Sequence, residues 1–81
     1  MEQEHEPGVA QPREVAAGGD EVRAYLVRQG MMKDDIAKYL LKARESGAAT
    51  FTFGPDEVGI VPRYTVIYAD GHYRLTVGHP T

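Results

Sequence analysis

The chain has 81 residues, a mass of 8.9 kDa, a formal charge of −3 and no cysteine. This length allows one small domain with a small core, and the lack of cysteine excludes disulfides, thiolate metal sites and thiol nucleophiles. The net charge is weakly acidic, so the chain lacks the overall positive potential that is typical of nucleic-acid-binding proteins.

Residues 1–19 differ in composition from the rest of the chain. They contain four glutamates and one arginine, and apart from Met1 no hydrophobic residue larger than valine. Such a segment buries too little apolar surface to offset the entropy of ordering. The composition therefore predicts a disordered acidic tail over 1–19 and one small α+β domain over 20–81. Without a signal-peptide pattern or an apolar run near about 20 residues, we expect a cytoplasmic protein with no membrane contact.

The first predicted helix covers about residues 21–29. Asp20 precedes it and is of the type that caps a helix N-terminus through its side chain. Gly30 follows it and favours the left-handed conformation that ends helices.

A second helix is predicted over 33–46. Ile36, Leu40 and Ala43 recur at i, i+4 and i+7, which places them on one apolar face. Gly47 then ends the helix. Because only a few residues separate the two helices, they are expected to form a helical hairpin.

The hydrophobic period changes to two from Thr50 onward. Alternating residues predict a strand over 50–53, a turn over 54–57 and a longer strand over 58–68. Proline cannot donate a hydrogen bond to a sheet, so Pro62 indicates a strand start, an edge position or a bulge.

Asp70-Gly71 predicts a β-hairpin with a two-residue type I′ turn. That turn pairs Ala69 with His72 and sets the register of both strands. The register places these residues on one apolar face: Tyr64, Val66, Tyr68, Tyr73, Leu75 and Val77. The predicted fold is thus α+β in the order α-α-β-β-β, with the two-helix hairpin packed on the aromatic face of a three-stranded antiparallel meander.

No constellation for catalysis or metal binding is found in the sequence. His5 lies in the predicted tail and His79 near the chain end, so His72 alone has a firm position, whereas a tight metal site needs three or four converging ligands. The single serine, Ser46, ends a helix. We therefore expect no enzymatic activity, no metal and no cofactor.

The opposite sheet face is the predicted functional surface. It mixes arginines with aliphatic residues and threonines, a composition found in modest protein interfaces. We expect a small protein-binding module, such as a regulator, inhibitor or assembly factor, whose partner is another protein. A homodimer, formed through this face or through exposed sheet edges, is a further hypothesis. The candidate binding residues are Val61, Arg63, Thr65, Ile67, His72, Arg74 and Thr76.

The alternative hypothesis is a DNA- or RNA-binding regulator. It would use the basic face of the helical hairpin, although the third helix that usually enters the groove is missing from the predicted fold. The candidate residues are Arg23, Arg28, Lys38 and Lys42.

Overall fold

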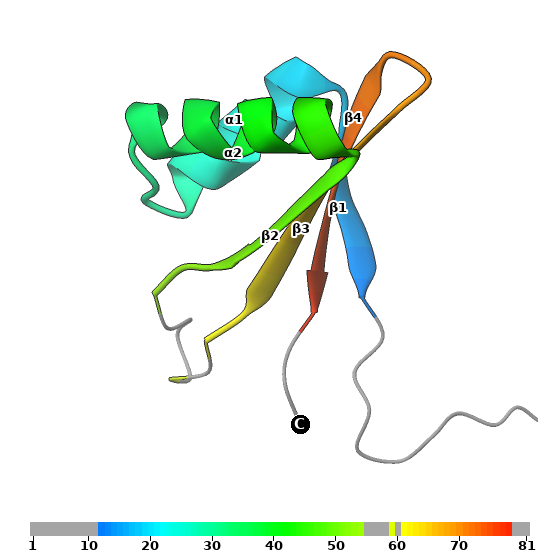
Figure 1. Ribbon diagram of the computed structural model, residues 1–81. Coiled ribbons are helices and arrows are strands. Elements are labelled where there is room, and N and C mark those ends of the chain that lie inside the picture. The colour runs from blue at the N-terminus through cyan, green and yellow to red at the C-terminus, as the bar shows by residue number, and fades with distance from the viewer. Residues whose placement is uncertain (1–11, 55–58, 60, 79–81) are drawn as a thin grey trace, which may run out of the picture.

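The computed structural model describes residues 12–54, 59 and 61–78 as a two-layer α+β fold (Figure 1). Its four strands form one antiparallel sheet in the order β1-β4-β3-β2. Both helices cover the same face: α1 contacts β1 and β4, and α2 contacts β2 and β3. In chain order the elements are β1 (Arg13–Ala17), α1 (Gly19–Arg28), α2 (Lys33–Ser46), β2 (Ala48–Thr52), β3 (Arg63–Ala69) and β4 (His72–Gly78).

Both helices occur close to their predicted positions. The predicted N-cap of the first helix was wrong, because α1 begins at Gly19 with Gly18 as its cap residue, and Asp20 lies in the first turn. The backbone N–H of Gly18 donates to the carbonyl of Tyr73 at 2.7 Å. The chain is thus held at the start of α1 by the sheet rather than by a side-chain cap. Asp20 interacts favourably with the helix dipole and lies 3.4 Å from Arg23.

α2 ends at Ser46 and is followed by Gly47 as its C-cap residue, as predicted. This glycine has φ 96°, and its N–H donates to the carbonyl of Ala43. Because a Cβ at Gly47 would meet nothing within 4 Å, any cost of a side chain there comes from the backbone conformation alone.

Gly47→Ala is expected to lower the free energy of unfolding by about 1–2 kcal/mol, since alanine avoids the left-handed region. Gly19→Ala is the matched control, because Gly19 is helical and its Cβ would make ordinary contacts of 3.5 Å with Arg23 and Tyr73. The control should be neutral or stabilising by up to about 1 kcal/mol. Urea denaturation followed by circular dichroism measures both; equal effects would contradict the backbone argument.

The β3–β4 hairpin has the predicted turn and register. Asp70 and Gly71 have φ values of 55° and 77°, as a type I′ turn requires. Ala69 pairs with His72, and the remaining pairs follow without a shift. The core-facing set of the hairpin is also confirmed: Tyr64, Val66, Leu75 and Val77 are buried, and Tyr68 and Tyr73 pack against the core.

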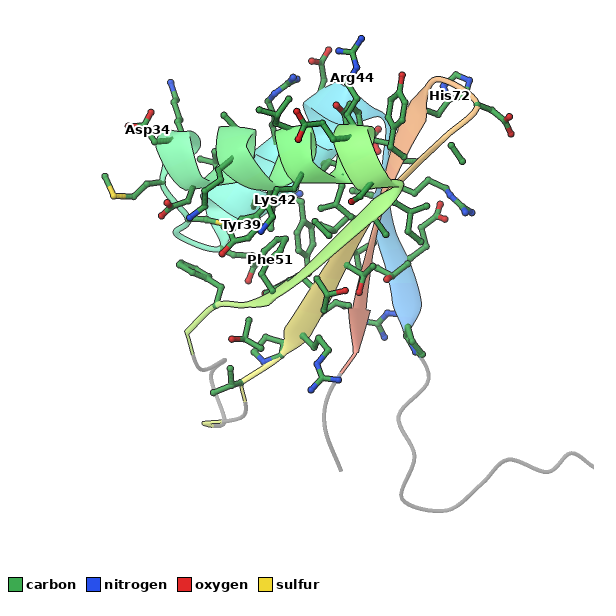
Figure 2. The ribbon with its side chains drawn as sticks, viewed as in Figure 1. Asp34, Tyr39, Lys42, Arg44, Phe51 and His72 are labelled. Carbon is green, nitrogen blue, oxygen red and sulfur yellow. The ribbon has the colours of Figure 1, made fainter. Side chains whose placement is uncertain are left out.

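The core lies between the helices and the aromatic face of the sheet, as predicted. Phe51 joins the two layers: its ring stacks on Tyr39 of α2 at 4.1 Å between centroids and on Tyr64 of β3 at 5.6 Å. Figure 2 shows Tyr39 and Phe51 meeting between α2 and β2. The buried hydrophobic residues are Ala16, Val22, Leu26, Met31, Ile36, Leu40, Ala43, Phe51, Tyr64, Val66, Leu75 and Val77.

The predicted three-stranded meander was wrong in its strand count, because the sheet has four strands. Arg13–Ala17, expected to belong to the tail, forms strand β1 and pairs antiparallel with β4. β4 is therefore an internal strand, flanked by β3 and β1. Pairing with the free backbone groups of β4 supplies the stability that the local composition of β1 lacks.

Some predictions fall on residues outside the described part of the chain. They concern residues 1–11 of the predicted tail, the turn at 55–57, the positions of Val58 and Ile60, and His79. Pro62 is described, and β3 begins directly after it at Arg63, so the strand start is the one of the three alternatives for Pro62 that applies. The predicted strand over 58–68 does not include 61 and 62, which belong to no strand. Neither described helix has the length and apolar character needed to cross a bilayer.

Candidate functional site

The sheet face opposite the helices is the candidate functional site. Side chains alternate between the two faces of each strand, and no described helix covers this second face. We call it the open face. The strand pairing arranges it in three rows: Ala17, Arg74, Ile67 and Ala48; Glu14, Thr76, Thr65 and Thr50; and Gly78, Arg63 and Thr52.

The middle of the open face is uncharged. Ile67, Thr65, Thr76 and Thr50, which we call the central strip, lie on the three neighbouring strands β2, β3 and β4. The Thr50 and Thr65 hydroxyls are 3.2 Å apart, and the Thr76 hydroxyl donates to the Thr65 carbonyl at 3.5 Å. These short side chains keep the strip shallow, so an approaching surface can come close to the backbone.

Charged residues border the central strip. Arg74 lies 3.5 Å from the carboxylate of Glu14, with both side chains about half exposed (52% and 47%). An exposed pair of this kind contributes only about 0–1 kcal/mol to stability. Arg63 forms no ion pair with any residue that the structure describes. The open face therefore carries one arginine whose charge is not matched within the described chain.

Six of the seven predicted binding residues lie on or beside the open face. Arg63, Thr65 and Ile67 come from β3, and Arg74 and Thr76 lie opposite them on β4. His72 is exposed beside the hairpin turn, as the first residue of β4 (Figure 2). The seventh, Val61, is 42% exposed but precedes β3 and belongs to no strand.

Sequence reasoning missed the two outer strands of the site. Glu14 and Ala17 of β1 were assigned to the tail, since two alanines and a bulge hide the alternation of that strand. Ala48, Thr50 and Thr52 of β2 were not named as candidates, although the alternation from residue 50 onward contained the signal. These residues almost double the width of the predicted surface.

The four basic residues of the nucleic-acid hypothesis are divided between the helices, with Arg23 and Arg28 on α1 and Lys38 and Lys42 on α2. Arg23 lines a hollow of about 330 Å³ between α1 and α2, whereas Arg28 lines a separate hollow of about 290 Å³ between α1 and β1. Arg23 also lies 3.4 Å from the Asp20 carboxylate. Lys38 lies over the ring of Tyr39, at 5.1 Å from its centroid.

The chemistry of the described residues gives no candidate metal centre. Within 12–54, 59 and 61–78, no three His, Asp or Glu side chains come together in a group that could hold an ion. A scan against protein-family models found no match for the chain, and searches of curated proteins and of solved structures also found none. A functional hypothesis therefore rests on the geometry of the open face.

Proposed function

We propose that this protein is a small non-enzymatic binding module that holds another protein against its open face. The observation that carries the proposal is the arrangement of that face, in which an uncharged strip around Ile67 is bordered by Arg63 and Arg74. Interfaces commonly have such a pattern, with apolar contact at the centre and arginine among the enriched residues.

The side chains of the central strip favour binding energetically. Threonine and isoleucine have few rotamers to lose, so ordering them in an interface costs less than ordering lysine or glutamate. The strip contains no charged group that a partner would have to desolvate. Contact with Ile67 then contributes apolar burial at about 25 cal/mol per Å², and the threonine hydroxyls can exchange water for polar groups of the partner.

The size of the open face limits the strength of the complex. Four strands about 4.8 Å apart, with five to seven residues each, cover roughly 400 Å². A standard interface buries about 800 Å² on each partner. The open face alone is therefore suited to a transient complex, unless the partner also contacts its rim.

Charge favours a partner with an acidic contact surface. Glu14 already neutralises Arg74 in part, whereas Arg63 has no such neighbour among the described residues. A carboxylate of the partner beside Arg63 would form a charge-assisted hydrogen bond at the edge of the contact. Regulators, inhibitors and assembly factors all act through binding of this kind.

The proposal is tested by partner capture with a double variant of the open face. Ile67→Asp/Arg74→Glu places a charge in the central strip and reverses the charge at its border, so capture should fall at least about tenfold. The matched control, Leu41→Asp/Arg28→Glu, makes the same changes on exposed helical positions and should leave capture unchanged. Circular dichroism shows whether both variants remain folded.

Undiminished capture by the folded open-face variant would remove this surface from the proposal. A salt-sensitive shift of mixed nucleic acid that is lost in Lys38→Glu/Lys42→Glu would instead favour the DNA- or RNA-binding alternative, because phosphate contacts weaken steeply with salt.

A further inference from the structure

The two edges of the sheet are built differently. β1, at one edge, carries Arg13 and Glu14 and has a bulge between Glu14 and Ala16. Charges and bulges are the usual devices that keep an edge strand from pairing with another chain. β2, at the other edge, lies in the uncharged sequence GAATFTFG over residues 47–54, which contains no proline. Its register with β3 is regular throughout. The β2 edge is thus the unprotected one.

The hydrogen bonding of β2 shows which residues face its free edge. The N–H of Tyr68 donates to the carbonyl of Gly47 at 2.9 Å. Since antiparallel partners alternate between bonded and non-bonded pairs, Ala49 and Phe51 bond toward β3, and the backbone groups of Ala48, Thr50 and Thr52 point outward. The Ala48 carbonyl accepts a hydrogen bond from the Ser46 hydroxyl at 2.9 Å, which agrees with this assignment and leaves the second lone pair of the oxygen for another donor.

We propose that two copies of the chain pair through their β2 edges, antiparallel and across a two-fold axis at Thr50. The outward-facing set of residues 48, 50 and 52 is symmetric about residue 50. The axis therefore places Thr50 opposite Thr50 of the second copy, and Ala48 opposite its Thr52. Each of these pairs exchanges two backbone hydrogen bonds, and the two sheets become one sheet with eight strands.

The helical layer fits the same arrangement. α2 contacts both β2 and β3, and we place its axis between these two strands, about half a strand spacing inside the β2 edge. Across the two-fold axis, the two α2 helices are then about two strand spacings apart, roughly 10 Å. Helices pack at distances of about 8–10 Å, so the helices contact one another without forcing the strands apart.

Two charges of α2, those of Asp35 and Lys42, are complementary across this dimer, whereas the ammonium of Lys38, which lies over the Tyr39 ring, comes close to its counterpart in the second copy. Tyr39 stacks on Phe51 (Figure 2). Because Phe51 follows Thr50 in β2, Tyr39 lies close to the proposed two-fold axis. Asp35 and Lys42, at i−4 and i+3 from Tyr39, share its side of the helix. Because the two α2 helices run antiparallel, Asp35 of one copy faces Lys42 of the other. A second copy is thus a better occupant of this edge than an unrelated extended segment.

This inference concerns the backbone edge of β2, whereas the proposed function concerns the side chains of the open face, so the inference does not depend on the proposed function. Pairing at β2 leaves the open face uncovered. Each copy has one row of threonines, which runs from Thr76 through Thr65 to Thr50. Pairing at β2 joins the rows of the two copies into one row across the dimer.

Cysteine cross-linking tests the pairing, because the natural chain contains no cysteine. In the dimer the two Thr50 Cα atoms are about 5.5 Å apart, within the range that a disulfide spans. Oxidised Thr50→Cys should therefore form a covalent dimer in high yield. Thr65→Cys is the matched control: it lies on the same face, one strand inside the edge, and should cross-link at least about tenfold more slowly.

The mass in solution provides the second measurement. Sedimentation should show twice the chain mass of 8.9 kDa, with dissociation on dilution.

Thr50→Pro removes an outward N–H without touching the β3 ladder and should raise the dissociation constant of the dimer at least about tenfold. Thr50→Lys replaces it if the proline variant does not fold. Asp35→Lys should also weaken the dimer, and Asp35→Lys/Lys42→Asp should restore it.

Three outcomes would overturn the proposal. The first is a wild-type chain that stays monomeric up to about 1 mM, because an edge of this design would then pair with something other than a second copy. The second is a dimer that is insensitive to both folded Thr50 variants. The third is cross-linking of Thr65→Cys as fast as that of Thr50→Cys, which would indicate a dimer formed face to face.

Discussion

Phe51→Ala is expected to lower the free energy of unfolding by about 3–5 kcal/mol. Phe51 is 6% exposed and is stacked between Tyr39 and Tyr64. Its removal leaves a cavity between α2 and the sheet and breaks two aromatic contacts, each worth about 0.5–1.5 kcal/mol beyond burial. Since domains of this size have a total stability near 5 kcal/mol, the variant should be largely unfolded at 25 °C.

Urea denaturation at low micromolar concentration measures this loss without a contribution from association. Phe53→Ala is the control, because Phe53 is the next aromatic residue along the same face but is only partly buried. Its loss should be clearly smaller. A Phe51→Ala variant that loses less than about 1 kcal/mol would show that α2 is held to the sheet by other contacts.

Leu75→Ala is the second substitution with a large expected effect, about 2–5 kcal/mol. Leu75 is fully buried on β4 and pairs with Val66 on one side and Ala16 on the other. β4 is internal, so a cavity at Leu75 is surrounded by packed residues and cannot be filled by solvent or by a shift of an edge strand.

Leu41→Ala removes the same number of carbon atoms from a side chain that is 55% exposed. It should change the free energy of unfolding by no more than about 0.5 kcal/mol. Thermal or urea denaturation of both variants gives the comparison. Similar losses would mean that the helix surface around Leu41 is covered in solution.

The features that local chemistry determines were predictable from the sequence. Asp70-Gly71 restricts the turn to a type I′ conformation. This turn type fixes which residues of β3 and β4 face the core. The spacing of Ile36, Leu40 and Ala43 identified the buried side of α2 in the same way. Because the open face is the complement of the core face, its β3 and β4 residues could also be named.

The features that depend on distant pairing were not predictable. β1 is short, contains two alanines and is interrupted by a bulge, so neither its composition nor its period indicates a strand. It is stabilised by β4, which follows it by more than fifty residues in the sequence. The same pairing explains the wrong N-cap, since Gly18 is held by Tyr73. Glu14 and Ala17 were missed for the same reason.

The position of β1 in the sheet has a consequence for how the chain folds during synthesis. β1 leaves the ribosome about 60 residues before its neighbour β4, which at roughly 5–20 residues per second leaves it without a partner for about 3–12 s. Closing this long loop also costs more entropy than any other strand pairing in the sheet, so this pairing should form most slowly. We therefore expect β2, β3 and β4 to assemble with the helices first and the earliest strand to be added last, as the step that completes the native state.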